Sequence, residues 1–173
     1  KTNANIVCVE YQHDIVDLAN ESIKYNGLEN QIKVVEADVL DLGKYFPGNN
    51  FDVIVCNPPY FTINEFSQVN DNSIKAIARH EIKINLEQII DISSRILQLK
   101  GEFYMIHRAE RIDEIICYCS KYNLNVKNIQ FITTKENEAP RMVLIRAVKG
   151  SEHNVKIGSF INISNYNSFK NIF

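Results

Sequence analysis

Apolar segments of strand length alternate with amphipathic segments of helix length along the chain, and this alternation limits the possible folds more than any other feature. Strand-like runs lie at 5–11, 31–38, 51–56 and 102–107. The third run, FDVIVC, is apolar on both faces, as the buried strands of parallel sheets are. Strands that alternate with helices predict an α/β fold, here a doubly wound and mostly parallel sheet with helices on both faces.

The segments between these strands have apolar residues three and four positions apart. This spacing predicts helices over 12–27, 85–99 and 109–122. The residues expected on the buried face of the first helix are Ile15, Leu18, Ala19 and Ile23. Asn85 followed by Gln88 predicts a capping box at the start of the second helix, and Gly101 predicts its end.

The C-terminal part of the chain has a different pattern. Segments 125–134 and 141–148 predict an antiparallel strand pair, which makes the sheet mixed. A length of 173 residues suits one domain, which we expect over 1–150, followed by a polar tail over 151–173. Residues 62–80 have no clear period and predict a long loop, which in a compact domain is more often functional than not.

Charge and composition exclude little. A net charge of −2 and a pI near 6.1 neither require nor exclude a nucleic-acid partner, because a basic patch can hide in a neutral total. No apolar run reaches membrane-spanning length and no signal peptide is evident, so we expect no membrane association. The four cysteines lack CxxC spacing and are expected to be reduced and buried, which favours a cytoplasmic protein. No His, Asp and Glu residues have metal-ligand spacing, and the pattern does not indicate an oligomeric state.

Three polar residues end three of the predicted strands. Glu10 ends the first run, Asp38 the second and Asn57 the third. In open α/β sheets, ligands bind beyond the carboxyl ends of the strands. The sequence therefore predicts a ligand site that Glu10, Asp38 and Asn57 share. For either acid taken alone, an exposed residue at a strand end is the better explanation, and the ordered set with Asn57 favours the ligand site.

The segment after the third run, NPPYF, carries the most specific chemistry. Proline fixes φ and has no N–H, so Pro58 and Pro59 form a stiff bend whose exposed polar atoms are carbonyls. If the Asn57 side-chain oxygen and the Pro58 carbonyl accept the two hydrogens of a planar NH2 group, the nitrogen is held in place to attack an electrophile. Tyr60 offers a ring for a planar base to stack on, and Phe61 could close the pocket. A plain turn is the alternative, and the position after a buried strand favours the site.

NPPY in this position resembles the signature of class I S-adenosylmethionine-dependent methyltransferases that act on planar amino nitrogens. NPPYF together with ARHE at 78–81 and APRMVLIRAVKG at 139–150 is similar to bacterial tRNA (adenine-N6) methyltransferases of the tRNA-Val type. The resemblance covers about residues 5–150. It implies methyl transfer from S-adenosylmethionine to the exocyclic N6 of an adenine in tRNA, with Asn57, Pro58 and Tyr60 in the catalytic site.

The same resemblance implies roles for the strand-end acids. Glu10 would accept hydrogen bonds from the ribose hydroxyls of the cofactor, with Tyr11 beside its adenine. Asp38 would accept from the adenine amino group, with the backbone of Val39 near the ring. Asn57 would border both the cofactor and the acceptor nitrogen.

The resemblance also implies residues that bind the substrate. Pro59, Tyr60 and Phe61 would contact the base, and Arg79 and His80 would lie near it, although a local ion pair explains these two equally well. His107, Arg108 and Arg111 could contact RNA phosphates. An ordinary solvated start of a helix is the alternative for these three.

One part of the family pattern is missing. The D-x-G-x-G loop that follows the first strand of these enzymes has no counterpart among the six glycines. We therefore expect the first strand, which normally lies between the 5–11 and 51–56 strands, to be absent. We also expect this chain alone to bind the cofactor weakly or not at all and to be inactive. Two other functions stay open: methylation of a protein glutamine at N5, in a release factor or ribosomal protein, and a non-catalytic RNA-binding module.

Overall fold

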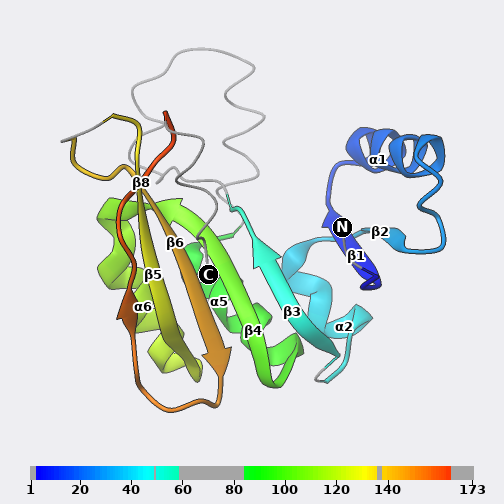
Figure 1. Cartoon of the computed structure of the whole chain (residues 1–173). Helices are drawn as coiled ribbons and strands as arrows, with labels where there is room; N and C mark the ends of the chain where they lie inside the picture. Colours follow the sequence, from blue (N-terminus) through cyan, green and yellow to red (C-terminus); the bar gives the residue numbers. More distant parts are fainter. Residues whose placement is uncertain (1–2, 49, 59–83, 136–137, 165–173) are drawn as a thin grey trace, which may run out of the picture. The chain divides into compact units, whose positions relative to one another are not determined.

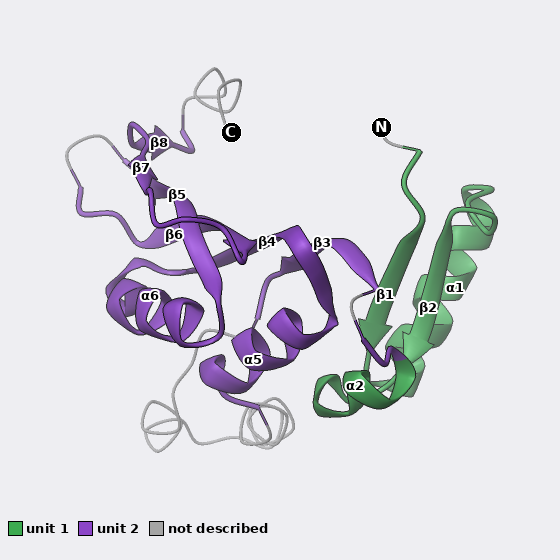
Figure 2. Ribbon diagram, turned by 90° about the horizontal axis from the view of Figure 1, so that it is seen from below, with its two compact units in different colours: residues 1–45 green, residues 46–173 purple. Residues whose placement is uncertain are grey.

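The computed structural model describes residues 3–48, 50–58, 84–135 and 138–164. The chain divides into two compact units, Lys1–Tyr45 and Phe46–Phe173. They are coloured separately in Figure 2, and each is described by itself below.

Unit 1 is a strand–helix–strand motif. It contains β1 (Ile6–Glu10), α1 (His13–Tyr25), β2 (Ile32–Glu36), the 3-10 turn η1 (Val39–Asp41) and α2 (Leu42–Tyr45). The two strands are parallel, in a register that pairs Ile6 with Ile32 and Glu10 with Glu36. These elements confirm the two strands and the helix predicted for this part of the chain.

The buried face of α1 differs from the prediction. Within the described residues Val16 is the buried residue of this helix, whereas Ile15 is 43% and Leu18 63% exposed. A two-stranded sheet is narrow, so it covers one side of the helix and leaves part of the apolar stripe in solvent.

Unit 2 contains a mixed sheet (Figure 1). Its elements are β3 (Phe51–Cys56), α5 (Leu86–Ile96), β4 (Leu97–Arg108), η2 (Ala109–Arg111), α6 (Ile112–Lys121), β5 (Leu124–Thr133), β6 (Met142–Lys149), β7 (Lys156–Ile157) and β8 (Ile161–Asn162). The strand order is β3-β4-β6-β5-β7, and β8 also pairs with β5. β3 and β4 are parallel, and β6 is antiparallel to β4 and β5, which confirms the predicted C-terminal antiparallel pair.

The core of unit 2 lies on the face of the sheet that α5 and α6 cover. Both helices are on the same side of the sheet (Figures 1 and 2). Alternate residues of β4 and β6 point into this layer, and Phe103, Met105, Val143 and Ile145 are fully buried there. Ile115 and Cys119 fill it from α6. The core therefore follows the two-residue period of the strands.

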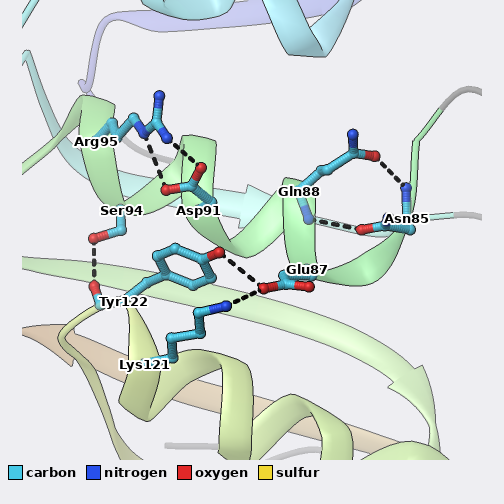
Figure 3. A network of polar contacts seen from close by, with 8 residues as sticks. All are labelled: Asn85, Glu87, Gln88, Asp91, Ser94, Arg95, Lys121 and Tyr122. Atoms are coloured by element: carbon cyan, nitrogen blue, oxygen red, sulfur yellow. Dashed lines mark hydrogen bonds and ion pairs between the residues drawn. The ribbon is translucent and has the colours of Figure 1, made fainter.

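A polar cluster joins the two helices (Figure 3). The predicted capping box is present, since Asn85 and Gln88 exchange hydrogen bonds of 2.9 Å. Glu87 Oε1 accepts from Lys121 Nζ at 2.6 Å and from the Tyr122 hydroxyl at 2.9 Å. These contacts fix the start of α5 against the end of α6.

The end of α5 was predicted wrongly. The helix stops at Ile96, ahead of Gly101, and Leu97 already has extended backbone with ψ of 136°. Lys149 Nζ donates to the carbonyl oxygens of Ser94 and Leu97 at 2.7 Å, which satisfies groups that a continuing helix would have used itself. Gly101 instead lies in the bend before β4 pairs regularly with β3. A Cβ there would lie 2.8 Å from Leu97 Cγ.

The second edge of β3 pairs with no described strand, and the same is true of β1. On β3, Val53 is 49% and Val55 78% exposed. The expectation that this chain lacks the first strand of the family stays a prediction. The predicted boundary at residue 150 also stays a prediction, and β7 and β8 beyond it pair with β5.

Two further expectations concern the environment of the chain. Cys8 and Cys117 are exposed, so the prediction that the cysteines are buried holds for Cys119, which is buried, and Cys56, which is half-buried. Among the helices that the structure describes, none combines the length and apolarity needed to cross a membrane.

Candidate functional site

Glu10 and Asp38 lie at the same edge of the unit 1 sheet. Glu10 is the last residue of β1 and pairs with Glu36, the last residue of β2. The backbone N–H of Ala37 donates to the Glu10 carbonyl at 3.0 Å, so the chain leaving β2 stays beside the end of β1. Parallel pairing thus places both predicted cofactor ligands at one carboxyl edge.

The Glu10 side chain has a fixed orientation. Its Oε1 accepts from the backbone N–H groups of Tyr11 and Gln12, each at 2.8 Å. These donors precede α1, which begins at His13, so the carboxylate also neutralises part of the positive end of the helix. No described residue donates a hydrogen bond to Oε2, which leaves an acceptor for a ligand hydroxyl.

Asp38 is oriented in the same way. Its Oδ1 accepts from the backbone N–H of Leu40 at 2.9 Å and caps η1. Val39 is half-buried and Tyr11 is 45% exposed. Carboxylates at two adjacent strand ends, with a partly exposed ring beside one of them, suit a ligand that presents hydroxyl and amino donors and a flat apolar surface.

Asn57 and Pro58 follow β3 in unit 2. Asn57 is exposed and Pro58 is buried. The Asn57 side chain, which carries the predicted acceptor oxygen, is therefore accessible to a ligand. The next residue, Pro58, is packed inside the protein. Of the other predicted site residues, Pro59, Tyr60, Phe61, Arg79 and His80 lie outside the described residues.

The three residues predicted to contact RNA phosphates differ in their burial and in their ion pairs. His107 is only 1% exposed and cannot meet a phosphate, so this role was predicted wrongly for it. Arg111 forms a two-armed pair with Glu114, at 2.9 and 2.7 Å, and its side chain is 17% exposed. The Arg108 side chain is 31% exposed and pairs with Glu110 at 2.8 Å. For Arg108 and Arg111, the alternative interpretation as ordinary residues at the start of a helix explains their ion pairs.

The burial of His107 was readable from the sequence. It alternates with Phe103 and Met105 along β4, and those residues face the core. Burial, with a smaller contribution from the positive charge of Arg111, lowers the pKa of His107 to about 4. The imidazole is therefore neutral at physiological pH.

Two other features do not coincide with the predicted site. A cavity of about 380 Å³ in unit 2 is lined by α6, the first half of β5 and residues 153–155, and contains none of the predicted site residues. In the described parts of the chain, no three His, Cys, Asp or Glu side chains gather in a way that could hold a metal ion.

Comparisons with known proteins agree with the methyltransferase resemblance that the sequence indicated. Residues 1–80 match the family model described as RMKL-like, methyltransferase domain. The tRNA1(Val) (adenine(37)-N6)-methyltransferase of Phocaeicola vulgatus is 28% identical over 145 residues, covering 84% of this chain and 59% of that protein. The enzyme of the same name from Bacteroides thetaiotaomicron is 27% identical over 154 residues, covering 89% and 62%. The chain thus spans about three fifths of the length of these relatives, and the predicted resemblance is confirmed.

Solved structures show the same fold. A predicted O-methyltransferase, Atu636 from Agrobacterium tumefaciens, matches with a TM-score of 0.67 and 22% identity, over 89% of this chain and 66% of that one. NSun6 from Pyrococcus horikoshii, solved with SFG, matches with a TM-score of 0.61 and 14% identity, over 86% and 42%. These similarities confirm the predicted class I methyltransferase fold.

Proposed function

We propose that this chain is part of an enzyme that transfers a methyl group from S-adenosylmethionine to the exocyclic N6 of an adenine in tRNA. The observation that carries the proposal is the placement of Asn57, exposed at the carboxyl end of a parallel strand, with Pro58 buried behind it. The similarity to curated tRNA (adenine-N6) methyltransferases supports the choice of substrate. A tRNA substrate would also place the protein in the cytoplasm.

The donor set of unit 1 fits the cofactor. S-adenosylmethionine, when bound, supplies an electrophilic methyl group on a positively charged sulfur. Glu10 would accept from its ribose hydroxyls through Oε2, since Oε1 is held by Tyr11 and Gln12. Asp38 would accept from its adenine amino group through Oδ2, since Oδ1 caps η1. Tyr11 and the backbone of Val39 would flank the ring.

The residues of unit 2 would hold the acceptor nitrogen. The Asn57 Oδ1 and the Pro58 carbonyl would each accept one N6–H, which turns the nitrogen lone pair toward the methyl carbon. Methylation would place positive charge on N6, and the two oxygens would stabilise that charge. The extra proton then leaves to solvent, so no strong base is needed. Tyr60 would stack on the base, together with Pro59 and Phe61, and Arg79 and His80 would lie near it.

The test is methylation by the full-length protein of total tRNA from cells that lack this modification, with nucleoside mass spectrometry as the readout. N6-methyladenosine should form in the presence of S-adenosylmethionine. Asn57→Ala should reduce kcat by 100-fold or more, on the order of the loss of one preorganised charge-stabilising group, with cofactor affinity within about threefold. The matched control is Asn20→Ala, because Asn20 is an exposed asparagine of α1.

Two outcomes would contradict the proposal. Methylated glutamine in a release factor or ribosomal protein, with no N6-methyladenosine, would favour the glutamine N5 reaction, whose acceptor is also a planar NH2. RNA binding without methyl transfer to either substrate would favour the non-catalytic module. Activity that survives Asn57→Ala would exclude the acceptor role of this residue.

A further inference from the structure

A buried histidine, His107, is the second-last residue of β4 and lies on the core side of the sheet. His107 is 1% exposed and pairs across the sheet with Val143, which is fully buried. It alternates with Phe103 and Met105 along β4, so it lies on the same buried face of the strand as these two core residues. A leucine at this position would avoid the cost of removing a polar ring from water.

The imidazole has one defined tautomer. Its Nδ1 accepts the backbone N–H of Arg108 at 2.9 Å. In the neutral ring the proton is therefore on Nε2. The hydrogen bond also fixes the ring against the turn that leads from β4 into η2.

The last residue pair of β3 and β4 lies close in sequence to both His107 and Pro58. β3 and β4 are parallel, and Cys56 pairs with Met105. This is the last pair of the two strands, and Pro58 and His107 each follow it by two residues. Paired residues of neighbouring parallel strands point to the same face, and both of these residues are buried. Asn57, one residue earlier, is exposed.

We propose that His107 is a positioning residue for the Asn57–Pro58 turn. Its ring, anchored by the Arg108 N–H, backs Pro58 and so fixes the direction in which the Asn57 amide oxygen and the Pro58 carbonyl face the substrate. The consequence for catalysis rests on the proposed function, because those two oxygens are the acceptors for the methylated amino group.

A neutral ring suits this place. Methyl transfer puts positive charge on the acceptor nitrogen, and a cation behind the Pro58 carbonyl would oppose that charge. His107 supplies a rigid, flat and polar support that remains uncharged at physiological pH. Lysine or arginine would introduce a charge, and an aliphatic side chain would leave the Arg108 N–H without its acceptor.

The test compares three variants of the full-length protein. His107→Leu keeps the volume but removes the acceptor, His107→Asn keeps an acceptor oxygen close to the position of Nδ1, and Met105→Leu is the control on the same buried face. His107→Leu should lower kcat about 10- to 100-fold, as small misplacements of catalytic groups do, with KM for tRNA and Kd for the cofactor within about twofold. His107→Asn should recover part of kcat, and Met105→Leu should leave kcat within about twofold.

A second readout does not depend on activity. In NMR spectra, the ¹⁵N shifts of the His107 ring should show a proton on Nε2 and none on Nδ1. The side-chain NH2 signals of Asn57 should shift in His107→Leu and stay near their original positions in Met105→Leu. If the wild-type protein methylates no tRNA, the proposed function fails, and these shifts still decide whether His107 positions the turn.

Three results would overturn the inference. One is an unchanged kcat and unchanged Asn57 signals in a folded His107→Leu protein. Another is a loss of activity in Met105→Leu as large as in His107→Leu, which would mean that any substitution in this core lowers kcat. The third is equal activity of the leucine and asparagine variants. If the leucine variant does not fold, His107→Asn compared with Met105→Leu decides by the same kcat and NMR criteria.

Discussion

Lys149 donates a hydrogen bond to the carbonyl oxygen of Leu97 at 2.7 Å, and this contact ties the end of β6 to the point where α5 becomes β4. The same amine donates to the carbonyl oxygen of Ser94 at 2.7 Å. Burial lowers the pKa of Lys149. The last turn of α5 thus depends on a side chain that is remote in the sequence.

Replacing Lys149 with methionine should destabilise the chain. The substitution keeps most of the aliphatic stem and removes the donor, so the helix C-terminal carbonyls lose a charged partner, at a cost of about 1–3 kcal/mol. Urea unfolding followed by circular dichroism measures it. Lys127→Met is the matched control, because Lys127 makes a single exposed hydrogen bond to the Glu152 carbonyl, and it should change stability by less than about 0.5 kcal/mol. Equal effects of the two variants would contradict the role of Lys149.

His107 should make the fold acid-sensitive. The pKa of a histidine is about 6.5 when unfolded and about 4 at this buried position. Between these values the unfolded chain binds a proton that the folded chain excludes. Stability is therefore complete above pH 6.5 and falls as the pH decreases toward 4, by roughly 3 kcal/mol in total. The charged groups that act on the ring are Arg108, Arg111 and Glu114.

The measurement is urea unfolding at pH values from 7 to 4. His107→Leu should flatten the decline in this window, while Met105→Leu should shift stability equally at every pH. A decline of the same steepness in His107→Leu would show that other groups cause it.

A second titrating group, the Glu102 carboxylate, should act at lower pH. Glu102 accepts from the Tyr104 hydroxyl at 2.6 Å and from Arg146, which also reaches Asn128 at 3.1 Å. The hydrogen bond from Arg146, followed by that from Tyr104, lowers the pKa of Glu102. Its contribution is thus present above the usual carboxyl pKa and is lost as the pH falls through the lowered value.

Glu102→Gln should remove this part of the acid dependence below about pH 4.5 while leaving the window between 6.5 and 4.5 unchanged. Thermal unfolding at closely spaced pH values separates the two regions. Glu110→Gln changes a mostly exposed carboxylate and serves as the control. An acid limb that is the same in Glu102→Gln and wild type would exclude the coupling to Arg146.

Glu10→Gln should weaken cofactor binding without disturbing the turn into α1. The glutamine oxygen can still accept from Tyr11 and Gln12, but the negative charge offered to the ribose hydroxyls is lost. We expect Kd for S-adenosylmethionine to rise about tenfold in the full-length protein, the equivalent of about 1.4 kcal/mol. Calorimetric titration measures it, with Glu36→Gln at the paired position of β2 as control. Unchanged affinity in Glu10→Gln would remove this residue from the cofactor site.

The sequence predicted the elements whose periodicity is strong. β3, β4, β5 and β6 follow the expected segments, and the antiparallel β5–β6 pair was identified from two apolar runs and the loop between them. The end of α5 was missed because Leu97 and Leu99 continue the apolar pattern of the helix. The break depends on Lys149, a contact that no local pattern contains.

The candidate site was predictable where it depends on strand ends. Glu10, Asp38 and Asn57 follow apolar runs, and the runs fixed their places at the ends of β1, β2 and β3. His107 was misread because Arg108 and Arg111 follow it closely in sequence. Its alternation with Met105 carried the correct information, since a strand sends every second side chain to the same face.

In unit 2 the helix α5 continues directly into the strand β4. Ile96 is the last helical residue and Leu97 the first residue of the strand, with no connecting loop between them. Leu97 already pairs with Phe51 of β3, so any displacement of the last turn of α5 acts directly on the start of the sheet's parallel pair.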